Sequence, residues 1–145
     1  MTHTGARDER GTAPVLEALV LTPVVVLIIA FIVIAAQVAM AKDAVANASS
    51  AAARAASQER SAGAAQGAAE RIASATLTGS SLECTDSAIA TDTSGFSVPV
   101  GIAAQVQVTV ACTASRSYLG LLNGGSRTYT ATSSAPLDVY RERAR

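Results

Sequence analysis

The sequence predicts an α+β protein. A long N-terminal transmembrane helix continues into an alanine-rich helix, which packs on a small antiparallel β-sheet of three to four strands. The 24 residues from Ala18 to Ala41 contain no charge, more than the roughly 20 residues that a helix needs to cross a bilayer. A proline-free, alanine-rich stretch follows, and apolar and polar residues then alternate around Val108.

The chain divides into four zones by composition. Residues 1–11 form a short charged leader, and residues 12–41 form the transmembrane helix. Residues 42–77 are rich in helix formers and are expected to extend the membrane helix as one continuous rod. Residues 78–145 are rich in Ser, Thr, Gly and Val and are expected to form a small β-rich domain. The part after the apolar run is long enough for one small domain.

The alanine-rich helix carries a thin stripe of small apolar residues that can cover a sheet. The stripe consists of Val38, Val45, Ala52, Ala56, Ala65, Ile72 and Leu77. Gly63 and Gly67 have GxxxG spacing. Because they lie outside the apolar run, they predict a weak point or a packing notch rather than a dimer motif.

The clearest predicted strand covers residues 102–115. Its alternation places one set of side chains on the buried face (Ala104, Val106, Val108, Val110 and Cys112) and Gln105, Gln107, Thr109 and Thr113 on the other. Residues 81–85 and 127–134 predict two shorter strands, bounded by turn residues.

Two cysteines, Cys84 and Cys112, both follow the apolar run and both fall on inward strand faces. If this part of the chain is exported, the sequence predicts a disulfide between them, which requires their two strands to be neighbours. Two buried free thiols are the alternative.

Catalytic and metal-binding patterns are absent from the sequence. The one histidine is His3, in the leader, and the 11 basic and 11 acidic residues balance, which does not suggest a nucleic-acid surface. Glu83, Asp86 and Asp92 are interpreted as a solvated loop. We therefore expect no enzyme, no cofactor, no metal and no small-molecule substrate.

Residues 10–23, RGTAPVLEALVLTP, resemble the TadE/TadG-like family of pilus assembly proteins, through Gly11, Glu17, residues 18–21 and Pro23. The resemblance implies a non-enzymatic, minor pilin-like subunit of the tight-adherence pilus, a branch of the type IV pilus superfamily. It implies a cytoplasmic N-terminus, an extracytoplasmic C-terminal domain and contacts with other pilin-like subunits through the membrane helix. The subunit either enters the surface pilus or primes its assembly.

The same resemblance implies that a prepilin peptidase cuts between Gly11 and Thr12. Glu17 would then be the sixth residue of the mature chain, whereas pilins usually carry this glutamate fifth, and Thr22 separates Leu21 from Pro23. A processed form and an unprocessed anchored form both remain open.

Glu17 has two interpretations. In packed pilin helices, its carboxylate would pair with a neighbour's new N-terminal ammonium, because either charge alone in an apolar setting is heavily penalised. Alternatively, Glu17 only marks the helix start, where the helix dipole favours a carboxylate.

A different class of function is also open: a secreted or single-pass anchored binding domain. Residues 39–41, Ala-Met-Ala, fit a signal-peptidase site. However, the apolar run is far longer than the 7–15 residues of a signal peptide's apolar region.

Overall fold

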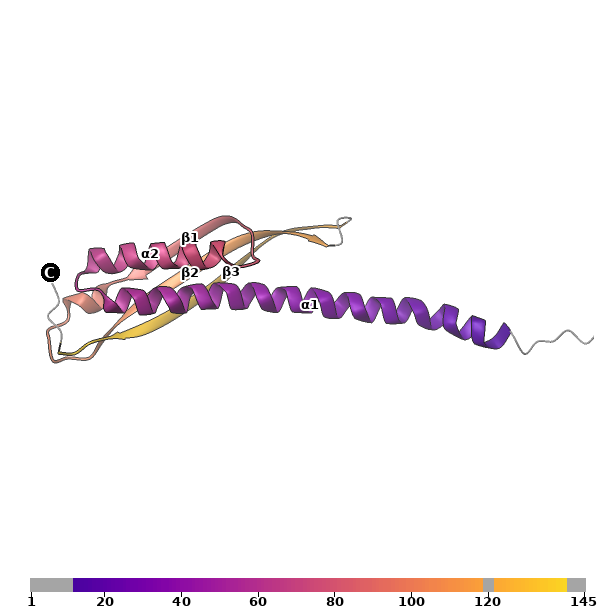
Figure 1. Ribbon diagram of the computed structural model, residues 1–145, viewed down its shortest axis with the longest axis horizontal. Coiled ribbons are helices and arrows are strands. Elements are labelled where there is room, and N and C mark those ends of the chain that lie inside the picture. Colours follow the sequence, from indigo (N-terminus) through magenta and orange to yellow (C-terminus); the bar gives the residue numbers. More distant parts are fainter. Residues whose placement is uncertain (1–11, 119–121, 141–145) are drawn as a thin grey trace, which may run out of the picture. The chain divides into compact units, whose positions relative to one another are not determined.

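The structure is a computed structural model that describes the backbone of residues 12–118 and 122–140, with side chains for residues 19–115 and 125–140. The order of elements is two helices, a strand, a short 3-10 helix and two further strands (Figure 1). The chain separates into two compact units, Met1–Gln37 and Val38–Arg145. The α+β class predicted from the sequence is confirmed.

Helix α1 covers Thr12–Gln58, 47 residues with Pro23 inside. Its part in the second unit buries a stripe of small side chains at helical spacing: Ala41, Val45, Ala48, Ser49, Ala52, Ala53 and Ala56. Since residues three and four apart share a helix face, this stripe forms one continuous contact surface.

The single rod expected over residues 42–77 is wrong, because α1 ends at Gln58 and α2 covers Ala62–Thr78. Ser61 has extended backbone angles and its hydroxyl accepts the N–H of Ala64 at 3.3 Å, which caps α2. Helix α2 runs back alongside the C-terminal part of α1 (Figure 1). A three-stranded sheet is about 14 Å wide and one helix about 10 Å, so covering one face needs both helices.

The break also changes which side chain α2 buries. Ile72, expected in the apolar stripe, is 38% exposed, and Ala73 is fully buried in its place. The stripe is otherwise confirmed for Ala65 and Leu77, which are both buried.

The sheet is antiparallel with the strand order β1-β2-β3. Strand β1 covers Cys84–Asp92, β2 covers Ala104–Tyr118 and β3 covers Leu122–Leu137. The alternation predicted for β2 is confirmed: Val106, Val108 and Val110 are fully buried, while Gln105 and Gln107 are exposed. Strand β1 begins later and ends later than the predicted residues 81–85, and β3 is longer at both ends than 127–134.

One apolar core joins the two helices to the sheet. Among the described residues, 11 of the 20 buried apolar side chains are alanine, so the core is built mainly by close approach of backbones. The largest contributions come from Tyr129 and from Phe96 of the 3-10 helix η2 (Ser94–Ser97). A polar contact also links the layers, since the hydroxyl of the buried Ser49 of α1 lies 2.8 Å from the hydroxyl of Ser133 of β3.

Candidate functional site

The N-terminal part of α1 is apolar and exposed over its described length. Leu19, Leu27 and Phe31 are 74%, 70% and 72% exposed, and no residue of the most apolar 18-residue window is buried within the structure. In water, such a surface would be strongly unfavourable, whereas lipid tails would cover it at no cost. Among the described residues, this is the one helix long and apolar enough to cross a membrane, which is consistent with single-pass anchoring.

Three of the four residues predicted for processing and assembly belong to the first 12 positions of this helix. Gly11 and the histidine of the leader lie outside the described residues, and Thr12 is the first residue of α1. Glu17 and Pro23 both belong to α1. The first turn contains no acidic residue, so Glu17 lies in the second turn, where the field of the helix dipole has largely decayed.

Thr12 and Glu17 belong to the same helix, so their backbone spacing follows from helix geometry. Five residues along a helix separate them by about 7.5 Å along the axis and by about 140° around it. The two positions are therefore more than one helical turn apart and lie on different sides of the helix.

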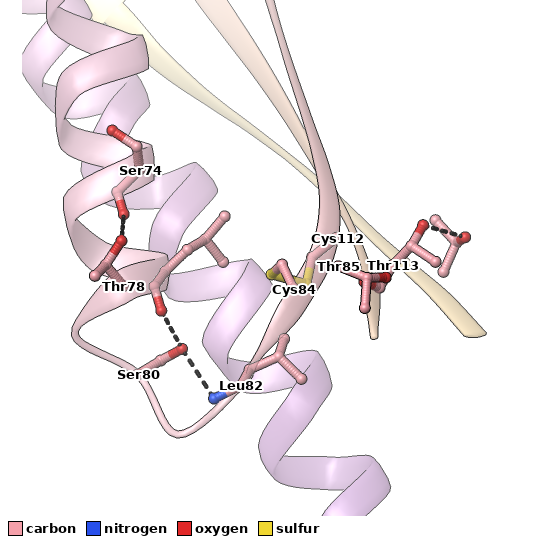
Figure 2. Close-up of a disulfide and its surroundings, with 10 residues drawn as sticks. Ser74, Thr78, Ser80, Leu82, Cys84, Thr85, Cys112 and Thr113 are labelled. Carbon is pink, nitrogen blue, oxygen red and sulfur yellow. Dashed lines mark hydrogen bonds between the residues drawn. A yellow bond between two sulfur atoms is a disulfide. The ribbon is translucent and has the colours of Figure 1, made fainter. Parts of the chain in front are cut away.

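The predicted disulfide Cys84–Cys112 is present, with the two Cα atoms 5.5 Å apart. Cys84 is the first residue of β1, and the next strand of the sheet carries Cys112, which is fully buried. Figure 2 shows the bond directly after the turn that leads from α2 into the sheet. In that turn, Ser80 donates to the carbonyl of Leu77 and accepts the N–H of Leu82. The disulfide therefore fixes the start of β1 to the central strand.

The acidic residues around β1 lie on the exposed surface of the second unit. The described residues contain no group of three or more metal-ligating side chains. Asp86 and Asp92 belong to β1 rather than to the loop predicted from the sequence, although both, like Glu83, are exposed. Asp92 accepts the backbone N–H of Ser94 at 2.9 Å, and this hydrogen bond lowers the pKa of the Asp92 carboxyl. This hydrogen bond binds the first residue of the 3-10 helix that follows β1, Ser94–Ser97.

Comparisons with known proteins found no relative: no family model, no curated protein and no solved structure matches the chain. Two features of the chain itself therefore define the class of the protein. These are an apolar helix suited to one membrane crossing and an α+β unit, Val38–Arg145, stapled by a disulfide.

Sequence reasoning identified the cysteines, Glu17 and the apolar run, but it missed a groove on the second unit. Lys42 of α1 and Arg127 of β3 both line this groove. They are 85 positions apart (127 minus 42), and no periodicity or motif connects them. Only the fold brings them together.

Proposed function

We propose that the chain is a non-enzymatic, minor pilin-like assembly subunit of a tight-adherence pilus, anchored by the N-terminal part of α1. The observation that carries the proposal is Glu17, a carboxylate in the second turn of an apolar helix. A charge at the edge of a bilayer is costly and is usually placed for a purpose. Its distance from Thr12 along the helix favours a partner on another subunit.

The disulfide supports the orientation of this subunit. Disulfides form and persist in oxidising compartments outside the cytoplasm. Cys84 and Cys112 both follow the apolar run, so the Val38–Arg145 unit is extracytoplasmic and the leader before Thr12 is cytoplasmic. A prepilin peptidase then meets the Gly11–Thr12 bond on the cytoplasmic face of the membrane.

A single-pass anchored binding domain is the second candidate. Val100 and Ile102 are 52% and 55% exposed, and Tyr140 is 89% exposed. The backbone N–H of Gly101 donates to the carbonyl of Val139 at 2.8 Å, which brings these apolar side chains to one end of the sheet. Exposed apolar residues that gather in this way are typical of binding surfaces. For a secreted form, cleavage after Ala41 would remove a core residue that is 6% exposed.

The test of the pilin-like function is the variant Glu17→Ala, expressed in place of the native chain. The apolar run is unchanged, so the variant should still resist carbonate extraction from membranes. Piliation and co-purification of other pilin-like subunits should fall, because a neighbour's ammonium would lose its partner, at a cost of several kcal/mol.

The matched control is Asp43→Asn, which removes an exposed carboxylate just beyond the run and should leave assembly intact. Normal piliation and co-purification in Glu17→Ala would contradict the proposal and favour the anchored binding domain. N-terminal sequencing of the native protein separates the processing routes, since the mature chain starts at Thr12, starts at Lys42 or keeps the residues before Thr12.

A further inference from the structure

We propose that a groove between α1 and β3 binds the phosphate group of an anionic lipid headgroup. The groove has a volume of about 350 Å³. It is lined by three residues of α1, Lys42, Val45 and Ala46, and by five consecutive residues of β3, Arg127 to Ala131. All of these residues belong to the Val38–Arg145 unit.

The position of Lys42 in the sequence favours a lipid headgroup as the occupant of the groove, an inference that rests on the membrane anchoring proposed above. The uncharged run of 24 residues ends at Ala41, directly before Lys42. As a helix it is about 36 Å long, against a hydrocarbon core of about 30 Å. The surplus of about 6 Å matches the depth of one headgroup layer, which is about 5–7 Å. Lys42 is the first charged residue after the run, so chain connectivity keeps it within reach of the lipid phosphates.

The charge of the groove suits an anion. Lys42 and Arg127 are both exposed, and neither forms an ion pair with any residue that the structure describes. The other cations of the two helices differ, because Arg54 and Arg71 donate to carbonyls of their own helices, those of Ser50 and Gly67. An arginine fork and a lysine ammonium together are well suited to phosphate oxygens.

The walls of the groove supply the remaining chemistry. Strand β3 is at the edge of the sheet, so every second backbone N–H along its outer side is directed away from β2, and such edges form anion-binding concavities. Ala46 and Ala131 add an apolar wall that can contact the glycerol and upper acyl part of a lipid, and the fully buried Val45 lies behind them. The buried Tyr129 of the core forms the inner part of the groove lining.

The test uses the full chain in nanodiscs that contain phosphatidylcholine alone or a mixture with phosphatidylglycerol. Native mass spectrometry then counts the lipids that stay bound after release from the disc. We expect retention of phosphatidylglycerol over phosphatidylcholine. The affinity should fall about fivefold in Lys42→Gln and in Arg127→Gln, and roughly 25-fold in the double variant. The control Arg54→Gln/Arg71→Gln removes two cations outside the groove and should retain the lipid.

A competition with inorganic phosphate identifies the source of the phosphate group. If the lipid is the ligand, millimolar phosphate leaves it bound. If free phosphate displaces it, and the displacement requires Lys42 and Arg127, the site is a phosphate site and the lipid assignment is overturned. Equal retention of both lipids, or equal loss in the groove and control variants, also overturns the inference.

These outcomes are separate from those of the pilin-like function. Lipid retention is measured on the isolated chain, so it does not depend on other pilus components. Loss of piliation in Glu17→Ala with unchanged lipid retention would leave the groove assignment intact. Failure of lipid selectivity in a chain that still assembles would remove the groove assignment alone.

Discussion

At the scale of single residues, two glycines in the same unit have opposite surroundings. A Cβ added to Gly95 would lie 2.2 Å from the backbone oxygen of Gln105, whereas a Cβ on Gly67 would have no atom within 4 Å. Gly95 belongs to η2 and allows this segment to lie directly against the start of β2. Gly67 lies inside α2, where an added Cβ would meet open space, so the missing side chain only weakens the helix.

Alanine substitutions at these two glycines should therefore shift stability in opposite directions. Gly95→Ala is expected to lower the free energy of unfolding by about 1–3 kcal/mol, because the backbone at the contact must move. Gly67→Ala is expected to raise it by up to about 1 kcal/mol, the difference in helix propensity. Chemical denaturation of the full chain in a mild detergent, followed by circular dichroism, measures both. If both variants shift the free energy of unfolding by the same amount and in the same direction, the backbone contact at Gly95 does not oppose an added Cβ.

The GxxxG spacing of Gly63 and Gly67 illustrates what a motif alone can decide. A Cβ added to either glycine would have no atom within 4 Å, so within this chain the spacing makes no packing notch. The weak-point interpretation fits the structure. Lys42 and Arg127 illustrate the reverse, because side chains that line one groove left no local pattern in the sequence.

At the scale of elements, the disulfide joins β1 to β2, the central strand, which pairs with both other strands of the sheet. Removal of both sulfurs in Cys84→Ala/Cys112→Ala should lower the free energy of unfolding by about 3 to 4 kcal/mol, on the chain-entropy estimate for a loop of this size. The cysteines are 28 positions apart. The free energy of unfolding of the native chain and of the double variant is measured with and without a reductant.

The double variant is its own control, because a reductant should destabilise the native chain and leave the variant unchanged. Alkylation followed by mass spectrometry should find two reactive thiols only after reduction. Two reactive thiols in native protein taken from the cell surface would contradict both the bond and its role.

The elements differ in how far the sequence predicts them. Strand β2 was predicted because valine and polar residues alternate along it, and burial follows that alternation. Most of β1 was missed, since SAIAT, residues 87–91, has too few large side chains to show a pattern; pairing with β2 and the disulfide hold it. The break between α1 and α2 was missed because Gln58, Glu59 and Arg60 are all good helix formers. In the sequence, only Ser61, the N-cap of α2, indicates the break. The helix breaks there because both helices are needed to cover the sheet.

At the scale of the whole molecule, the two units solve different physical problems. The first presents large apolar side chains outward, which suits a lipid solvent. The second buries mostly alanine and valine between two helices and three strands. Alanine buries little area per residue, so this core leaves a small stability reserve, and the disulfide is a large part of it.

The independent folding unit should begin near Val38. A fragment that starts there keeps the buried residues Ala41, Val45 and Ala48, whereas a fragment of residues 49–145 loses all three. Val38–Arg145 should be soluble without detergent and should unfold in one cooperative transition. The shorter fragment should lose at least about 2 kcal/mol through Val45 alone, a large share of the stability of a small domain.

Circular dichroism and analytical ultracentrifugation of the two fragments, both oxidised, provide the measurement. A cooperative, monomeric longer fragment and a poorly folded shorter one would establish that the residues before Val38 are not needed for folding. Aggregation of the longer fragment, with the full chain well folded in detergent, would show the opposite. In that case, the apolar part of α1 would stabilise the fold as well as anchor the chain.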